Sequence, residues 1–382
     1  MEHSSHPTFP LALTFDDILL TPGYSDFSRG DITLASKLTR NITLHIPLVS
    51  SPMDTVTESE LAIELGKIGG MGIIHRNLTV TDQSEEVKKV VAAGQIVGAA
   101  VGANKGFEER VEALVGAGVN VLLVDSAHGY AHNVIETVKF IKSQYPTIDV
   151  IAGSIATGEG ATALIDAGAD ALRVGMGPGA ICTTRIISGM GVPQVSALLD
   201  IIPIAKKARV PVIADGGIKY SGDMVKALAI GADTVMMGSF FAATKESPGK
   251  KVLLSRDQVP SRFKSILQTD INEYVFKEYR GMGSVGAMKK GAQIKSEDEF
   301  HGKSYKDRVM VAEGVEGLVP VKGTLSQVVE QAIGGIKSGL YYVGARTLTE
   351  LFEKATFMQI TQASLTESHP HDVLITNAGE NY

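Results

Sequence analysis

The only cysteine of the 382-residue chain lies in a loop that could carry a nucleophile. This cysteine loop, Gly175–Arg185, has three glycines before Cys182 and two threonines directly after it. Glycine tolerates backbone conformations that other residues resist, so the loop can turn its carbonyl and amide groups toward a ligand. A thiol beside hydroxyls and a guanidinium is a candidate nucleophile, although a free cysteine is more often a small buried apolar side chain. Because the loop is glycine-rich and follows an apolar run, Ala171–Val174, the two interpretations have about equal weight.

Short apolar segments alternate with amphipathic helical segments from residue 46 to residue 238. This alternation predicts eight parallel strands joined by right-handed helical crossovers, and eight strands favour a closed (β/α)8 TIM barrel over an open doubly wound sheet. The predicted strands are Ile46–Val49, Gly72–His75, Ile96–Val101, Val119–Asp125, Asp149–Ala152, Ala171–Val174, Val210–Asp215 and Thr234–Gly238. The predicted helices include Glu58–Lys67, Phe107–Gly116, Ala131–Ser143, Gly158–Ala167 and Ser221–Ala229.

Small, polar and glycine residues follow the C-terminal ends of these strands, where barrels of this kind place their active sites. Two of these places, Gly216-Gly217 after the seventh strand and Gly238-Ser239 after the eighth, are where barrels often bind a phosphate on backbone amides. Either pair alone would be read as an ordinary turn. Their occurrence at neighbouring strand ends favours a phosphate site.

A long insertion, from about residue 247 to 323, separates the eighth strand from the last predicted helix, Ser326–Ser338. Its middle, Lys289–Arg308, is charged and poor in β-branched residues. Long loops in compact domains are mostly lids or disordered, so we expect a mobile flap at about residues 285–313. The polar tail, about residues 364–382, is expected to leave the globule and meet a neighbouring subunit.

Composition restricts the classes of function. The net charge of −6 lacks the basic surface of a nucleic-acid-binding protein, and one cysteine excludes an intrachain disulfide framework. The polar start, Met1–Pro10, lacks the apolar core of a signal peptide, and no apolar run is long enough to span a membrane. We therefore expect a cytoplasmic enzyme with no nucleic-acid or membrane partner.

Three further motifs are weak. Gly281–Gly286 matches the dinucleotide fingerprint, but no clear strand precedes it. Gly302-Lys303-Ser304 lacks the upstream glycine of a phosphate loop, because Glu297 occupies that position. The histidines and the aspartate of His369–Asp372 lack a cysteine or carboxylate partner at metal-ligand spacing, which favours ordinary surface residues.

Seven segments follow one another along nearly the whole chain. They are Leu13–Leu20, Ser50–Glu58, Asp125–Gly129, the cysteine loop, Asp215–Ile218, Tyr279–Ser284 and Glu367–Asp372. Together they resemble the inosine 5′-monophosphate (IMP) dehydrogenase and GMP reductase family. The resemblance implies NAD-dependent oxidation of IMP to XMP, through a covalent thioimidate on Cys182, in guanine nucleotide biosynthesis. The family usually carries a pair of regulatory modules of the cystathionine-synthase type (CBS modules), inserted in the barrel near the join of the second helix and the third strand. Here Lys88–Gly94 continues directly into Gln95–Val101, which predicts a single catalytic domain, residues 1–382, without CBS domains.

The resemblance also implies roles for individual residues. The catalytic residues would be Cys182, Thr184 and Glu313. The substrate-binding residues would be Ser51, Met53, Asp215, Gly216, Gly217, Gly238, Ser239, Tyr279, Met282, Gly283 and Glu313. The cofactor-binding residues would be Asp125, Ser126, Arg173 and Gly175. A potassium site would be formed by Gly177, Gly179 and Cys182, together with Glu367, Ser368 and His369 from a neighbouring subunit, which implies a homotetramer.

Three positions depart from the family pattern. Ala180 stands where the family has serine, and Ser154 stands where it has asparagine. Glu299-Phe300 occupies the place of the flap Arg-Tyr pair that activates the hydrolytic water, and Tyr305 and Arg308 occur in the opposite order and at a different spacing. Ala180 removes one hydroxyl that would bind the phosphate, and the altered flap pair makes water activation the step of the reaction that is most affected.

Two alternatives stay open. A GMP reductase, which releases ammonia and takes hydride from NADPH, needs no such pair, and Tyr341–Leu351 somewhat resembles that enzyme. The segments Ser50–Glu58 and Arg280–Ser284, and the tail, favour the dehydrogenase instead. The third hypothesis is a purine-nucleotide-binding protein without turnover, which the altered flap favours and the intact Cys182, Thr184 and Glu313 disfavour.

Overall fold

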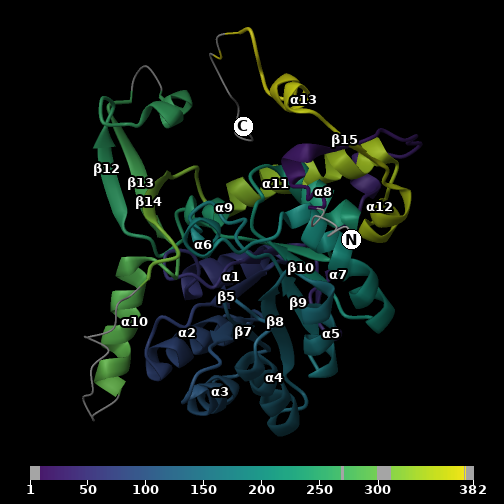
Figure 1. Cartoon of the computed structure of the whole chain (residues 1–382). Coiled ribbons are helices and arrows are strands. Elements are labelled where there is room, and N and C mark those ends of the chain that lie inside the picture. Colours follow the sequence, from purple (N-terminus) through teal and green to yellow (C-terminus); the bar gives the residue numbers. More distant parts are fainter. Residues whose placement is uncertain (1–8, 268–270, 299–310, 374, 376–382) are drawn as a thin grey trace, which may run out of the picture.

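A closed barrel of eight parallel strands forms the centre of the computed structural model, which describes residues 9–267, 271–298, 311–373 and 375 (Figure 1). The barrel strands are β4 (Leu48–Ser50), β5 (Met71–Ile74), β6 (Gly98–Val101), β7 (Val121–Asp125), β8 (Asp149–Ile155), β9 (Ala171–Val174), β10 (Val212–Asp215) and β11 (Thr234–Met237). Each pairs in parallel with its neighbour, and β11 pairs with β4 to close the barrel. The predicted (β/α)8 barrel is confirmed, and each predicted strand overlaps one barrel strand.

Helices surround the barrel because each buries one apolar face against it. They are α1 (Ser59–Ile68), α2 (Val80–Ala92), α3 (Phe107–Gly116), α4 (His132–Gln144), α5 (Gly158–Asp166), α7 (Gln194–Ala208), α8 (Ser221–Ile230) and α11 (Leu325–Val343). In α11, Leu325, Val329, Ala332, Ile336 and Leu340 recur every three or four residues, and all are buried. Five residues, 93–97, join α2 to β6, so the structure contains no inserted domain at that place.

The inside of the barrel is filled with apolar side chains. Every barrel strand contributes to one buried cluster, for example Val49 from β4, Ile151 from β8 and Met236 from β11. The hairpin β2 (Ser36–Lys37) and β3 (Thr43–Leu44) adds Leu44 to this cluster. Because the barrel is a packed core rather than a pore, chemistry is left to the loops at the strand ends.

The insertion after β11 is more ordered than the sequence predicted. The short helix α9 (Ser239–Ala242) is followed by a three-stranded antiparallel sheet of β12 (Lys251–Ser255), β13 (Glu273–Arg280) and β14 (Glu316–Pro320), with the 3-10 helix η3 (Ser261–Ile266). Helix α10 (Val285–Asp298) occupies much of the segment predicted to be a mobile flap (Figure 1). The predicted flap residues Glu299-Phe300, Tyr305 and Arg308 lie outside the described residues.

The structure also corrects the reason for discounting Gly281–Gly286. These residues do follow a strand, β13, and lead into α10. However, β13 pairs in antiparallel fashion with β12 and β14, so the motif is not part of a βαβ unit.

Segments near the two ends of the described chain pair with each other, and the first part of the tail, as far as His369, contacts the same chain. Strand β1 (Ile18–Leu20) pairs with β15 (Phe357–Gln359). Near the start of the chain, β1 follows η1 (Phe15–Asp17) and precedes η2 (Arg29–Asp31). Near its end, β15 follows α12 (Leu348–Lys354) and precedes α13 (Gln362–Glu367). The ring of His369 lies 5.9 Å from the ring of Tyr220 of the same chain. Among the described residues, no helix is long and apolar enough to cross a membrane.

A buried lysine anchors β13 to the loop that follows α9. Lys277 is 1% exposed, and its ammonium donates hydrogen bonds to the carbonyl of Lys245 at 2.8 Å and to Oγ of Ser247 at 3.1 Å. Burial, together with the nearby charge of Lys251, lowers the pKa of Lys277 to about 8.

This lowered pKa predicts a rise in stability at alkaline pH. Between pH 8 and about 10.5 the unfolded chain, with an ordinary lysine pKa, binds a proton that the folded chain has lost. The free energy of unfolding should therefore rise with pH across this window, by up to about 3 kcal/mol. Urea denaturation at several pH values would show this rise in the wild type and its loss in Lys277→Met. An equal rise in both proteins would contradict the prediction.

Candidate active site

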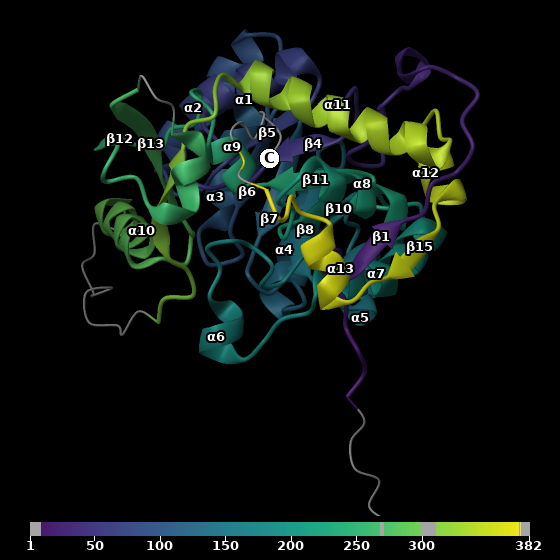
Figure 2. The ribbon, with the colours of Figure 1, turned by 90° about the horizontal axis from the view of Figure 1, so that it is seen from above.

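Several of the predicted site residues lie at the C-terminal ends of the barrel strands, and others lie in the insertion after β11 or in the tail. Figure 2 shows the barrel from above with the insertion and α13 around it. Ser51 follows β4, and its amide donates to the carbonyl of Met237 in β11 at 3.1 Å. Asp125 ends β7, Asp215 ends β10, and Gly238 follows β11. The barrel therefore brings together residues that are far apart in the sequence, as its architecture requires.

Cys182, Thr184 and Glu313 form a continuous line of contacts. The thiol of Cys182 donates to Oγ1 of Thr184 at 3.3 Å, and the Thr184 hydroxyl donates to Oε2 of Glu313 at 2.8 Å. Cys182 is the only cysteine, is free, and is partly exposed. A nucleophile, a hydroxyl and a carboxylate within hydrogen-bond reach are the parts needed to transfer a proton to or from a reacting atom.

Backbone hydrogen bonds hold the cysteine loop against the segment that carries Glu313. The amide of Thr183 donates to the carbonyl of Glu313 at 3.0 Å, and the amide of Val315 donates to the carbonyl of Ile181 at 3.0 Å. Cys182 and Gly314 form an isolated antiparallel bridge. The Thr184–Glu313 contact is thus supported by main-chain pairing on both of its sides.

Two carboxylates share one guanidinium between β7, β9 and β10. Arg173 donates from Nε to Asp215 at 2.7 Å and from an Nη atom to Asp125 at 2.6 Å. Burial alone would raise the pKa of Asp125, but the charges of Arg173 and Arg76 outweigh it and hold this pKa below its usual range. Burial likewise opposes the charge of Arg173, but Asp215 and Asp125 raise its pKa. Asp125 and Arg173 are therefore both charged at neutral pH. Arg76, 3.4 Å from Asp125, was not identified from the sequence.

The predicted phosphate loops lie against the cysteine loop. Gly216 and Gly217 have φ of 87° and 78°, a region that favours glycine, and a Cβ on Gly216 would lie 3.0 Å from Pro178. Tyr279, at the end of β13, reaches the strand end at Gly238, and its burial, with the charge of Asp215, raises its pKa. Tyr279 is thus a neutral hydroxyl, able to donate a hydrogen bond to an anion.

Space beside Gly238 is limited, which predicts a steric effect of a single methyl group. A Cβ on Gly238 would lie 2.6 Å from the Tyr279 hydroxyl and 2.9 Å from the sulfur of Met53. Because φ at Gly238 is −99°, alanine fits the backbone there, and the methyl group should act by displacing these two side chains. We expect Gly238→Ala to raise the KM for the nucleotide about 10-fold or more, as misplaced contacts do.

The matched control for this substitution is Gly222→Ala in α8, where an added Cβ meets nothing within 4 Å. Alanine at that helical position is expected to leave KM unchanged and to stabilise the fold slightly. Steady-state kinetics of both variants test the prediction, and an unchanged KM in a folded Gly238→Ala enzyme would contradict it.

The segment Gly281–Gly283, which we call the base segment, is held by residues that the sequence analysis did not single out. The amide of Asp54 donates to the sulfur of Met282 at 3.4 Å, and the carboxylate of Asp54 binds Arg280. Asn77 donates to the same carboxylate at 2.8 Å. Asp54 could have been found from the sequence, because it belongs to the motif Ser50–Glu58, which directly follows a predicted strand.

The structure does not bring the two halves of the predicted potassium site together within one chain. Gly177 and Gly179 lie in the cysteine loop with Cys182, whose amide donates to the carbonyl of Gly179 at 3.1 Å. Ser368 and His369 instead line a cavity of about 260 Å³ with residues of α8 and η1, and no residue of the cysteine loop lines it. Within the described part of the chain, no cluster of three or more histidine, cysteine or acidic side chains could hold a metal ion.

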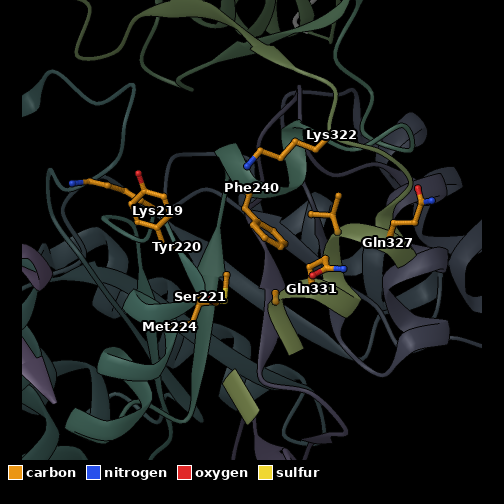
Figure 3. A pocket seen from close by; sticks show the side chains of 10 residues that line it. Lys219, Tyr220, Ser221, Met224, Phe240, Lys322, Gln327 and Gln331 are labelled. Carbon is orange, nitrogen blue, oxygen red and sulfur yellow. The ribbon is translucent and has the colours of Figure 1, made fainter. Parts of the chain in front are cut away.

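A further cavity, of about 120 Å³, lies outside the line of contacts at Cys182. It is enclosed by residues of α8, α11 and α9, with Phe240 and Lys322 at its rim (Figure 3). Phe240 directly follows Ser239, so this cavity adjoins the loop after β11 from the side of the helices.

Comparisons with known proteins agree with this geometry. A family model described as "IMP dehydrogenase / GMP reductase domain" matches residues 12–371. An inosine-5′-monophosphate dehydrogenase of Cryptosporidium parvum is 43% identical over 97% of this chain and 97% of its own length. Proteins of the same name from Borreliella burgdorferi and Rhodopirellula baltica are 41% and 39% identical, over 95% and 97% of this chain and 97% and 88% of their own lengths. The alignment with the latter spans 499 residues, so that relative carries residues with no counterpart here. The chain therefore belongs to the IMP dehydrogenase / GMP reductase family.

Proposed function

We propose that this protein oxidises IMP to XMP, a step of guanine nucleotide biosynthesis, and that the reaction proceeds through a covalent intermediate on Cys182. The observation that carries the proposal is the line of contacts from Cys182 through Thr184 to Glu313. The names of the relatives, which are dehydrogenases, support oxidation rather than reduction of the purine.

The chain's own residues account for both halves of this reaction. Sγ of Cys182 forms a bond to C2 of the purine as the C2–N3 double bond opens, and C2 then gives up a hydride, for which NAD would be the acceptor, to leave a thioimidate. Water then attacks C2, the C2–S bond breaks, and the thiol is regenerated as XMP leaves. Thr184 can take a proton from that water and pass it to Glu313, since its hydroxyl lies beside the sulfur that would carry the intermediate and donates to the Glu313 carboxylate. Dividing one difficult step into two easier ones is the gain of covalent catalysis.

Asp215 and the loops after β10 and β11 suit the ribose and phosphate of the nucleotide. One oxygen of Asp215 accepts from Arg173, and its other oxygen accepts no hydrogen bond within the described part of the chain, which leaves it available to ribose hydroxyls. Gly217, Gly238 and Ser239 offer backbone groups at neighbouring strand ends, where a phosphate can bind.

The residues expected to hold the cofactors have suitable chemistry. Asp125, Ser126, Arg173 and Gly175 would hold NAD, which supplies the hydride acceptor when bound. The carbonyls of Gly177, Gly179 and Cys182 are hard oxygen donors of the kind that coordinate potassium. Completion of that site by Glu367–His369 of a neighbour, and hence the homotetramer, belong to the proposal, as does a cytoplasmic location.

A paired absorbance assay with potassium present tests the proposed function. One cuvette contains IMP with NAD, and the other contains GMP with NADPH. Appearance of NADH in the first supports the dehydrogenase. Loss of NADPH in the second with a silent first cuvette would make the protein a GMP reductase, and silence in both would favour a nucleotide-binding protein without turnover.

A further inference from the structure

A buried carboxylate that takes no part in the proposed reaction lies just after β4. The side chain of Asp54 is fully buried, and Arg280 donates to its two oxygens, from Nε at 3.0 Å and from an Nη atom at 2.5 Å. Burial would raise the pKa of Asp54, but the hydrogen bonds from Arg280 and Asn77 outweigh it and lower this pKa. The pair is therefore ionised and bidentate, an arrangement that fixes geometry as well as charge.

This ion pair holds the residue that leads directly into the base segment. The backbone amide of Arg280 donates to Oγ1 of Thr55 at 3.2 Å, so both the main chain and the side chain of Arg280 bind the loop after β4. The same loop contacts Met282 through the amide of Asp54, and Asn77 also donates to the carbonyl of Ala287 in α10 at 3.2 Å. The start of the base segment is thus bound to the barrel from several directions.

The far end of the base segment is bound to Glu313. The amide of Glu313 donates to the carbonyl of Gly283 at 3.1 Å, and its carboxylate accepts from Thr184. A hydrogen bond from the amide of Ser284 to the carbonyl of Gly281, at 2.9 Å, closes the segment into a tight turn. A shift of Arg280 would therefore move the groups that face the purine and also the carboxylate that serves Thr184.

We propose that Asp54 is a positioning residue for the reaction, acting through Arg280 to place the base segment and Glu313. The inference rests on the proposed function, in which the base segment contacts the purine. It goes further by assigning the placement of those contacts to an ion pair whose two members are not among the residues expected to bind IMP or the cofactor. A pair that only stabilised the fold would, when broken, lower the amount of folded enzyme without changing the KM of the enzyme that remains.

Binding and kinetics of four variants separate these roles. Asp54→Asn removes one charge at nearly constant shape, and Arg280→Gln removes the other with a shorter polar side chain. The double variant removes both charges, and Arg280→Lys keeps the charge without the bidentate fork. The matched control is Asp149→Asn. Asp149 is also a buried, hydrogen-bonded carboxylate, 3% exposed, but it precedes Val150 at the start of β8, at the opposite end of the barrel.

We expect Asp54→Asn and Arg280→Gln each to raise the KM for IMP about 10-fold and to lower kcat, with the KM for NAD unchanged, because a misplaced group can cost up to about 10²-fold. The double variant should resemble either single variant, because the two residues act as one unit. Arg280→Lys should fall between Arg280→Gln and the wild type. Asp149→Asn should lose stability but keep its KM.

Titration of IMP into variants that also carry Cys182→Ala distinguishes failure of this inference from failure of the proposed function. If the Cys182→Ala protein itself does not bind IMP, the proposed function fails. If that protein binds IMP and the addition of Asp54→Asn changes nothing in a folded protein, this inference alone fails. Additive effects of the two charge removals, or an equal rise in KM in Asp149→Asn, would also overturn it.

Discussion

Replacing Cys182 with alanine is expected to lower kcat about 10³-fold or more while IMP still binds. Cys182 is the only cysteine of the chain and contacts Thr184, so no second thiol can replace it as the nucleophile. Loss of a covalent nucleophile removes the reaction path itself, which is why such losses are among the largest seen in enzymes. Steady-state NADH formation gives the loss of turnover, and calorimetric titration with IMP gives the retained binding.

The same substitution also tests the covalent intermediate directly. After a quench in acid, mass spectrometry of the wild type incubated with IMP and NAD should show a nucleotide attached to the peptide that contains Cys182. The alanine variant should show no such adduct. Full activity of Cys182→Ala, or an adduct on another residue, would contradict the assignment.

Removal of the Thr184 hydroxyl should have the second largest effect. Thr184→Val keeps the shape of the side chain but breaks both the contact with Cys182 and the 2.8 Å hydrogen bond to Glu313. Proton transfer by a positioned group contributes about 10²- to 10⁴-fold to a rate, so kcat should fall by at least about 10²-fold. Release of the product from the covalent intermediate should slow more than hydride transfer does, because in the proposed reaction Thr184 takes its proton from the hydrolytic water.

The neighbouring threonine provides a control for this effect. Thr183 precedes α6 (Thr184–Ser188), and its side chain makes no capping hydrogen bond. Thr183→Val should therefore change kcat less than about threefold, since it removes a hydroxyl from the same loop without touching the proton path. Rapid-mixing measurements of the first turnover would separate the two steps, and a loss of hydride transfer equal to the loss of hydrolysis would exclude the proposed role of Thr184.

The barrel could be predicted from the sequence because its signal is local and repeated. Each strand is a short buried run such as Val121–Asp125, and each is followed by a helix with a periodic apolar face.

The insertion could have been predicted in part. In β13 buried Tyr274 and Phe276 alternate with exposed Glu273 and Val275, but Lys277 is buried as well and interrupts the alternation. Glycines within α10 weaken its helical signal.

The site could be predicted as a set of residues but not as an arrangement. The resemblance named Cys182, Thr184 and Glu313, and the structure supplies the distances between them. The pairing of Asp54 with Arg280 could not be predicted, because residues 226 positions apart meet only when the insertion packs on the barrel. From the sequence alone, Asp54 could equally be an exposed carboxylate or a buried one in an ion pair.

The bridge between Cys182 and Gly314 has a consequence for the protein while it is being made. Ribosomes add about 5–20 residues per second and domains fold from the N-terminal side, so all eight barrel strands leave the ribosome several seconds before Glu313 does. During that interval the thiol is present without the carboxylate that completes its proton path. A chain released early, before the insertion is finished, would lack Glu313 and also α11, so it would have neither the proposed proton path nor the last of the helices that surround the barrel.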